Sequence, residues 1–441
     1  GLDVLLIEKG ATPGSKNMFG GRMYSHALQR VIPNFWEEAP TERAVVKEII
    51  TFLTEDRGVS LTCQDENWAK SPSHSFTLFR AEFDAWLAAK AEEAGAMVAC
   101  GIRVDDLLLD KGRVIGVRAG DDELLAEVVI AADGTNSLMA QKAGLREELQ
   151  PSEVAAGVKQ VIELSPDIIN ERFQLTGEQG AACLLVGACT RGMPGGGFLY
   201  TNRSSISLGL VVKAAELQRN QFRLNELLED FKAHPQIAPL IQGGRVAEYS
   251  AHLVPETGWA RRPELFGDGI LVAGDAAGLV INLGYLVRGM DLAIASGEAA
   301  AKTVIEAAAK QDFSRQALSR YHDWLKECQV WPEMETYRRA PQFLENPELY
   351  TGYPDLIGRA VSHLFTVNGT PSAPGAPKLV GGNKDKGLRL ELMWDDGGMM
   401  TFELTNVIVT THSNPIRGAA DELMESVEML AGGCSLVVSD W

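Results

Sequence analysis

Three short motifs place a carboxylate directly after an apolar run that is typical of a buried strand. Glu8 follows LDVLLI, Asp133 and Gly134 follow EVVIAA, and Asp275 follows GILVAG. A carboxylate at the end of a parallel strand can accept hydrogen bonds from the hydroxyls of a ribose or a ribityl chain. Each motif alone is also compatible with a plain turn. Their order and separation together predict one crevice that binds a dinucleotide.

Glycines near these acids favour a close approach of the backbone to a ligand. Gly274 and Gly278 flank Asp275 in GDAAG, and Gly20, Gly21 and Arg22 form a second loop of this character. We expect the second loop to lie on the far side of the ligand's ring system.

Small and polar residues also lead into a long Ala-rich segment, 289–309, which favours a buried helix. They are Asn282, Gly284, Gly289 and Met290. The positive end of this helix would abut an isoalloxazine ring and stabilise the negative charge of a reduced flavin. The alternative is a glycine-containing loop before a core helix. With the three acids, the pattern predicts FAD as the cofactor.

Two features concern the phosphates of that cofactor. Arg80 opens a predicted helix and would balance the phosphates or contact a ribose, or else it is a surface cation. The sequence starts at the strand that ends in Glu8, and the GxGxxG loop that normally precedes this strand is not in it. We therefore expect pyrophosphate binding to need a segment ahead of Gly1.

The sequence offers no nucleophile or acid–base pair, and we assign no catalytic residue. Electron transfer through a flavin needs few catalytic side chains, because the cofactor carries the chemistry. His252 and Tyr249 would line the acceptor side, although a lone histidine is more often structural. Residues 195–198 would border the substrate cavity.

The surrounding elements predict an α/β protein. An FAD-binding Rossmann-like domain comes in two parts, 1–150 and 256–310, with an antiparallel-sheet substrate domain inserted at 151–255. A helical region, 311–370, and a linker with an unassigned tail, 371–441, follow. In the first domain we expect a buried parallel strand over 1–10 and a helix over 80–94 that Gly95 ends. In the middle domain we expect one helix, over 224–233. We expect the tail to contain two or three strands and a helix over 419–430.

Composition excludes several classes of function. The chain has 441 residues and a formal net charge of −18, which disfavours nucleic acid or an anionic membrane as a bulk partner. No apolar run is long enough for a transmembrane helix. The six cysteines form no CxxC pair and no cluster with histidine, so we expect no metal or iron–sulfur site. Scattered cysteines suit a cytoplasmic protein, with at most a peripheral contact at the inner membrane.

From residue 1 to about 370 the chain resembles the FixC branch of the electron-transfer-flavoprotein:quinone oxidoreductase family, to which the geranylgeranyl reductases are more distant relatives. The matching stretches include LLIEKG, KNMFGGRMYSHAL, FRAEFDAWL, RFQLTGEQGAACLLVG, GGGFLYTN, EYSAHLVPE and VAGDAAGLVINLGYLVRGMDLAIASGEAAAKTV.

The resemblance implies an FAD enzyme that takes electrons from an electron-transfer flavoprotein and passes them to a quinone, within a bifurcating complex that supports nitrogen fixation. A separate ferredoxin-like subunit would supply the iron–sulfur cluster. The motifs and the resemblance together predict these cofactor-binding residues: Glu8, Lys9, Gly20, Gly21, Arg22, Arg80, Val104, Asp133, Gly134, Gly274, Asp275, Gly278, Asn282, Gly284, Gly289 and Met290.

Two alternatives remain open on the sequence. A prenyl-chain reductase of the geranylgeranyl type would use the same scaffold with a long apolar tunnel. A truncated remnant without bound FAD would serve at most as an interaction surface.

Overall fold

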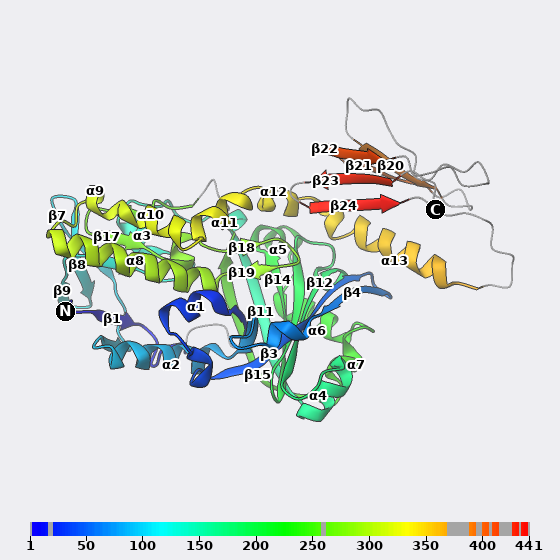
Figure 1. The fold of residues 1–441 in the computed structure, drawn as a ribbon, viewed down its shortest axis with the longest axis horizontal. Helices are drawn as coiled ribbons and strands as arrows, with labels where there is room; N and C mark the ends of the chain where they lie inside the picture. The colour runs from blue at the N-terminus through cyan, green and yellow to red at the C-terminus, as the bar shows by residue number, and fades with distance from the viewer. Residues whose placement is uncertain are drawn as a thin grey trace. The chain divides into compact units, whose positions relative to one another are not determined.

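The computed structural model describes residues 2–15, 21–256 and 262–367, together with five strands beyond them. The chain divides into two compact units, Gly1–Leu364 and Phe365–Trp441. Figure 1 labels the elements of both. Gly20 lies outside the described residues, as do residues 368–387, which include the stretch predicted as a linker.

A nine-stranded sheet dominates the first unit, with the order β15-β11-β14-β13-β12-β3-β5-β2 and β4 paired with β3. The strands are β2 Gly21–Tyr24, β3 Thr41–Leu53, β4 Gly58–Gln64, β5 Ser75–Leu78, β11 Val154–Glu163, β12 Gln179–Gly187, β13 Gly195–Thr201, β14 Ser205–Lys213 and β15 Arg245–Pro255. All pairs are antiparallel except β12 with β3. The expected antiparallel sheet is present, and β2–β5 extend it into the segment before residue 151.

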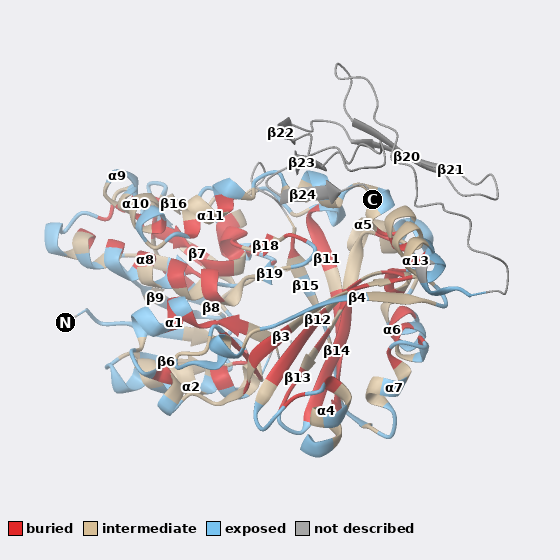
Figure 2. Cartoon of the chain, turned by 45° about the vertical axis from the view of Figure 1, so that its right-hand side comes forward, coloured by how far each residue is buried: buried red, intermediate tan, exposed pale blue. Residues whose placement is uncertain are grey.

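One face of this sheet packs against helices, and the side chains between them form an apolar core. Helices α4 (Pro166–Phe173), α6 (Leu224–Ala233) and α7 (Ala238–Ile241) cover this face with side chains such as Phe173 and Phe231. Figure 2 shows the buried residues along β3 and β12–β14. The expectation of a single helix in this part of the chain was incomplete, because α4, α5 (Ala214–Asn220) and α7 are present as well. Ser165 before Pro166 is a start signal for α4, since the serine side chain accepts from the amide of Ile168.

The Rossmann-like part consists of parallel pairs. β1 (Leu5–Glu8) pairs with β6 (Met97–Cys100), and β10 (Val129–Ala131) pairs with β17 (Ile270–Val272), which β16 (Phe266–Gly267) extends in the antiparallel sense. A separate antiparallel sheet contains β7 (Asp106–Asp110), β8 (Arg113–Ala119) and β9 (Asp122–Leu125). These elements confirm the α/β fold class.

The first strand is parallel as expected, but the prediction that it is buried was wrong. Leu5 is 42% exposed and Leu6 is 41% exposed. Within the described part of the chain β1 pairs only with β6, so one edge and much of its side-chain surface have no cover.

Helices carry the rest of the first unit. α2 (Arg80–Glu93) ends before Gly95, whose φ of 98° suits the helix end, as predicted. The long helix α8 (Met290–Lys310) confirms the Ala-rich segment. The remaining helices are α1 Ser25–Val31, α3 Leu138–Lys142, α9 Arg315–Leu318, α10 Arg320–Glu327, α11 Val330–Thr336, α12 Ala340–Leu344 and α13 Gly352–Phe365. Among the described residues no helix is both long and apolar enough to cross a bilayer.

The second unit contains two small antiparallel sheets. They are β20 (Leu388–Met393) with β21 (Met399–Leu404), and β22 (Ile408–Ser413) with β23 (Ser426–Ala431) and β24 (Cys434–Ser439). The helix predicted over 419–430 is therefore wrong in its second half, because residues 426–431 form β23 between two partner strands. Pairing on both edges overrides the local helix preference of SVEMLA.

The side chain of Lys47 on β3 caps the C-terminal end of α4. Its Nζ donates to the carbonyl oxygens of Phe173 and Gln174 at the end of α4, at 2.8 and 3.3 Å. A cation at a helix C-terminus satisfies carbonyls that have no partner inside the helix. We expect Lys47→Met to lower the free energy of unfolding by about 1–2 kcal/mol in urea titrations. Lys142→Met, at an exposed position, is the control; equal losses in the two variants would contradict this capping role.

Candidate functional site

Two of the predicted acids follow neighbouring parallel strands. In the pairing of β10 with β17, Ala131 lies opposite Val272, and the amide of Ala273 donates to the carbonyl of Ala131 at 3.0 Å. The loops beyond these strands are tied together, because Ser137 Oγ donates to the carbonyl of Ala276 at 2.8 Å. The loop with Asp133 and the loop with Asp275 therefore lie at the same edge of the sheet, as predicted.

Asp275 presents a half-buried carboxylate at this edge. Burial raises its pKa, and the positive charges of Arg80 and His252 lower it in part. Among the described residues, none donates a hydrogen bond to this carboxylate. Asp133 is exposed, and its Oδ2 accepts the amide of Met139 at 2.9 Å. Asp275 is thus the acid of the pair that is free to accept hydrogen bonds from a ligand.

Basic groups from three other segments share the electrostatic neighbourhood of Asp275. Burial lowers the pKa of His252 on β15; Asp275 opposes this effect, and Arg80 and Lys9 add to it. Arg80 stands at the first residue of α2 and donates to both carboxylate oxygens of Asp84, at 2.7 and 2.8 Å. The start of α2, β15 and the GDAAG loop therefore lie within electrostatic range of one another, and Lys9, in the segment after β1, lies within that range of His252.

Glu8 lies at the end of β1 as predicted, but its carboxylate is used locally. Glu8 Oε1 accepts the amide of Gly10, and the Glu8 carbonyl accepts the amide of Ile102 at 3.1 Å. Val104, two residues further on, packs against the core that contains β10 and β17. The end of β1 and the loop after β6 are therefore joined, and this loop leads to the core that contains β10 and β17.

Glycines bring two further segments against the start of α8. A Cβ at Gly274 would lie 3.3 Å from Ala293 Cβ, and the Gly274 amide donates to Ser296 Oγ at 2.9 Å. A Cβ at Gly21 would lie 3.2 Å from Met290 Cε. The GDAAG loop and β2 thus both contact the first turns of α8, which Gly289 precedes.

Three other predicted glycines have backbone conformations that favour glycine. Gly134, Gly278 and Gly284 have φ values of 78°, 68° and 82°, a region that favours glycine. Asn282 has a structural part here, since its Oδ1 accepts the amide of Gly284 at 2.9 Å. Its Nδ2 donates to Glu256 Oε1 at 3.4 Å, in the turn between β18 (Ile281–Asn282) and β19 (Val287–Arg288).

Arg22 does not lie in a loop, so this expectation was wrong for it and for Gly21. Both belong to β2, where they pair with Leu78 and Thr77 of β5. The Arg22 side chain is 8% exposed and forms an ion pair with Glu48. Sequence reasoning missed Glu48, although an acid in the otherwise apolar run EIITFL was a usable signal.

The two residues predicted for the acceptor side, His252 and Tyr249, do not lie on the same face of the sheet. Successive side chains of a strand alternate between faces, so His252 and Tyr249 point to opposite faces of β15. His252 pairs with Gly157 and lies within electrostatic range of Asp275, whereas Tyr249 is 50% exposed. In residues 195–198, the ring of Phe198 stacks on Tyr200 with centroids 5.3 Å apart.

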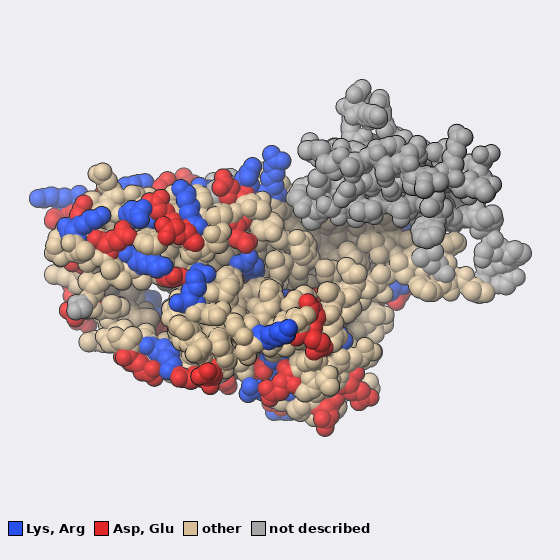
Figure 3. Space-filling view, viewed as in Figure 1, with Lys and Arg blue, Asp and Glu red and all other residues tan. Residues whose placement is uncertain are grey.

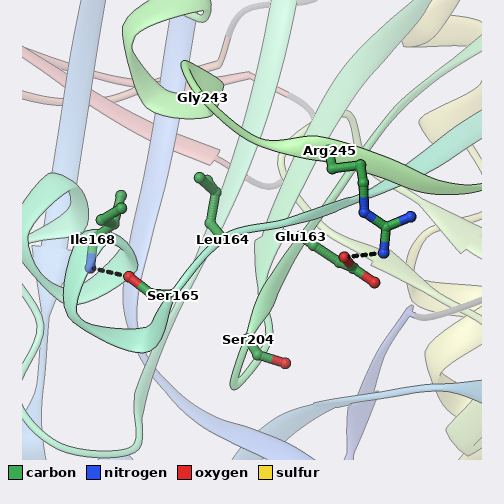
Figure 4. Close-up of a pocket in the computed structure, with 7 residues that line it drawn as sticks. All are labelled: Glu163, Leu164, Ser165, Ile168, Ser204, Gly243 and Arg245. Atoms are coloured by element: carbon green, nitrogen blue, oxygen red, sulfur yellow. Dashed lines mark hydrogen bonds and ion pairs between the residues drawn. The ribbon is translucent and has the colours of Figure 1, made fainter.

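An open cavity of about 460 Å³ lies elsewhere and is not this site. Its lining residues are Glu163, Leu164, Ser165, Ile168, Ser204, Gly243 and Arg245 (Figure 4). None of the predicted residues lines it, and its charged pair, Arg245 with Glu163, is at the surface.

Charges of both signs are interspersed over the face of the molecule in Figure 3. The described part of the chain contains no group of three or more His, Cys, Asp or Glu side chains placed to hold a metal ion.

Comparisons with known proteins agree with this architecture. The model of the ETF-QO/FixC family C-terminal domain matches residues 340–395, so the likeness continues beyond residue 370, where we expected it to end. The protein FixC of Salmonella typhi is 48% identical over 396 residues, covering 90% of this chain and 92% of that protein. A probable electron transfer flavoprotein-quinone oxidoreductase, YdiS of Escherichia coli strain K12, is 48% identical and covers 88% of this chain and 90% of its own.

A solved structure shares the fold. The geranylgeranyl bacteriochlorophyll reductase-like protein of Thermoplasma acidophilum superposes with a TM-score of 0.66 at 23% identity, covering 82% of this chain and 86% of that one. At this identity the likeness concerns the fold alone, and it confirms the Rossmann-like class.

Proposed function

Because this chain belongs to the electron-transfer-flavoprotein:quinone oxidoreductase (ETF-QO)/FixC family, we propose that it accepts electrons from an electron-transfer flavoprotein and passes them to a quinone. The chain is an FAD-dependent oxidoreductase. The observation that carries the proposal is the 48% identity, over most of both chains, to a relative named for this reaction.

Two features of the described residues support binding of FAD at its ribityl and ring end. The Asp275 carboxylate, which accepts no hydrogen bond from the described residues, would hold ribityl hydroxyls. The start of α8, at Gly289 and Met290, would lie against the ring, where its partial positive charge favours negative charge. Lys9 and Arg80 would add positive charge toward the phosphates. When bound, FAD supplies the redox chemistry, and these residues orient it.

The arrangement of domains follows from the same proposal. Residues 1–150 and 256–310 would form the FAD-binding part, which the pairing of β10 with β17 supports. Residues 151–255 would form the acceptor side, together with β2–β5 of the same sheet. Regions 311–370 and 371–441 would add the helical part and the tail.

The physiological setting is a finer part of the proposal. We further propose that the chain works in a complex with electron-transfer flavoprotein subunits and a separate ferredoxin-like subunit, in a bifurcating pathway for nitrogen fixation, as its resemblance to the FixC branch implies. The protein would work in the cytoplasm, with a peripheral contact at the inner membrane where it meets the quinone.

A two-stage assay tests the reaction. We expect the purified protein to show the visible absorbance of oxidised flavin, to lose it when mixed with reduced electron-transfer flavoprotein, and to regain it on addition of a benzoquinone analogue. Reoxidation by a geranylgeranyl lipid instead of the quinone would favour a prenyl reductase. Absence of bound flavin after FAD is added would contradict the proposal altogether.

A further inference from the structure

Four side chains converge between the large sheet and the start of α8, and we call them the Glu48 cluster: Arg22 and Tyr24 of β2, Glu48 of β3 and Tyr200 of β13. Arg22 forms an ion pair with Glu48, and its guanidinium carbon lies 4.6 Å from the centroid of the Tyr24 ring. The Arg22 Nε and Nη2 also donate to Ser75 Oγ, at 3.0 and 2.9 Å. The cation of the cluster is therefore held in one place.

The strand register puts Glu48 and Tyr200 on one face of the sheet. Glu48 pairs with Ala182 of β12, and Ala182 pairs with Tyr200. Directly paired residues of neighbouring strands point to the same face. The neighbours Lys47 and Ile49 contact α4 and the apolar core on the opposite face. Glu48 is thus turned away from the core, toward Arg22 and Tyr24 of β2.

The cluster borders the place proposed for the flavin ring. The strand that carries Arg22 contacts the start of α8 through its other face, where a Cβ at Gly21 would lie 3.2 Å from Met290 Cε. The guanidinium carbon of Arg288, two residues before α8, lies 5.7 Å from the Tyr24 ring centroid. A ligand at the start of α8 would therefore have the Glu48 cluster beside it.

Glu48 is the member of the cluster suited to exchange a proton. Burial raises its pKa above the ordinary value, and the ion pair with Arg22 only partly reverses the rise. Burial also raises the pKa of Tyr24 to about 12 and raises that of Tyr200, so both phenols keep their protons.

Titratable groups on three strands face Glu48. They are Arg22 and Tyr24 of β2, Tyr200 of β13, and Cys63, its partner on β4. Cys183 of β12 pairs with Ile49 and belongs to the apolar core on the opposite face. The Glu48 side chain is 27% exposed, which gives its carboxyl contact with solvent protons.

We propose that Glu48 delivers protons to the bound electron acceptor while Arg22 holds its carboxyl in place; this inference rests on the proposed quinone reduction. A quinone that takes two electrons from the bound cofactor also takes two protons, one on each carbonyl oxygen. In each delivery the O–H bond of the Glu48 carboxyl breaks, an O–H bond forms on the acceptor, and the carboxylate regains a proton from water.

The test compares two acceptors, because only one of them needs protons. Holoenzyme of the wild type and of Glu48→Gln is reduced, and reoxidation is followed from pH 5.5 to 8.5 with a benzoquinone analogue and with ferricenium, which takes one electron and no proton. We expect Glu48→Gln to reoxidise about 100-fold more slowly with the quinone and within about twofold of wild type with ferricenium. The wild-type quinone rate should fall as pH rises, because less Glu48 is protonated, and the variant should lose this dependence.

Glu42→Gln is the matched control. Glu42 lies on the same strand, its Oε2 accepts the amide of Arg203 at 2.7 Å, and burial raises its pKa too, but it is outside the cluster. We expect wild-type rates and pH profiles from this variant with both acceptors.

The possible outcomes distinguish the role of Glu48 from the proposed quinone reaction. Wild-type quinone rates and pH dependence in Glu48→Gln would overturn the role of Glu48 and leave the quinone reaction standing. If the wild type shows the same pH dependence with ferricenium as with the quinone, the proposed role of Glu48 is overturned without any variant. Failure of wild type to reduce the quinone, with ferricenium still reacting, would overturn the proposed function itself.

Discussion

Replacing Asp275 by alanine is expected to raise the dissociation constant of FAD by about 5- to 150-fold, which corresponds to ~1–3 kcal/mol. The carboxylate is half-buried at the edge where β10 and β17 end, and none of the described residues donates a hydrogen bond to it. Removing an acceptor that holds ribityl hydroxyls loses those bonds and leaves the hydroxyls without a partner. Titration of the apoprotein with FAD, followed by flavin fluorescence, measures the change.

The acidity of Asp275 adds a pH dependence to this prediction. Burial raises its pKa, so the carboxylate takes up its proton at a higher pH than an ordinary aspartate. A protonated carboxyl accepts hydrogen bonds less well, and FAD affinity should therefore decline as pH falls through that raised value. Asp275→Ala should lack this decline.

An exposed acid serves as the control for Asp275. Asp230 on α6 is 57% exposed in its side chain and pairs with Arg191 at the surface. Asp230→Ala should bind FAD as the wild type does. An unchanged dissociation constant in Asp275→Ala would remove this residue from the cofactor site.

Replacing Arg43 by methionine is expected to lower the free energy of unfolding by about 3–5 kcal/mol. Arg43 is 2% exposed, and its guanidinium donates to four oxygens. They are the carbonyls of Asn202, Gln179 and Arg203, at 2.6, 2.7 and 3.1 Å, and Asn170 Oδ1 at 2.6 Å. Methionine fills similar volume but donates no hydrogen bond, so polar oxygens would be left buried without partners.

Urea denaturation followed by circular dichroism measures this loss. Arg219→Met is the control, because the Arg219 side chain is 73% exposed and its pair with Glu216 is at the surface. A surface change of this kind should stay within about 0.5 kcal/mol. A loss below about 1 kcal/mol in Arg43→Met would mean that water or neighbouring donors replace the guanidinium.

Local patterns in the sequence predicted the elements whose boundaries depend on nearby residues. The helix that Gly95 ends and the Ala-rich helix after Gly289 were predicted at close to their observed bounds, because helix propensity and terminal glycines act within a few residues. The convergence of the loops with Asp133 and Asp275 was also predictable, since the carboxyl ends of neighbouring parallel strands share one edge. The roles of the individual cofactor-binding residues stay predictions.

Contacts between distant segments could not be read in the same way. The use of 426–431 as a strand was missed because strand pairing depends on partners that local composition does not reveal. The exposure of Leu5 and Leu6 likewise depends on which strands lie beside β1.

What the sequence determined by itself is therefore the order of strands, helices and acid-tipped turns, and through its family likeness the class of cofactor. What only the tertiary structure decided is which side chains come together: Arg22 pairs with Glu48, Arg43 donates to four oxygens, and Asp275 lies within electrostatic range of Arg80 and His252. The physical reason is range. Propensities and turn preferences act over a few neighbouring residues, whereas these contacts join segments that only the packed sheets and helices bring together.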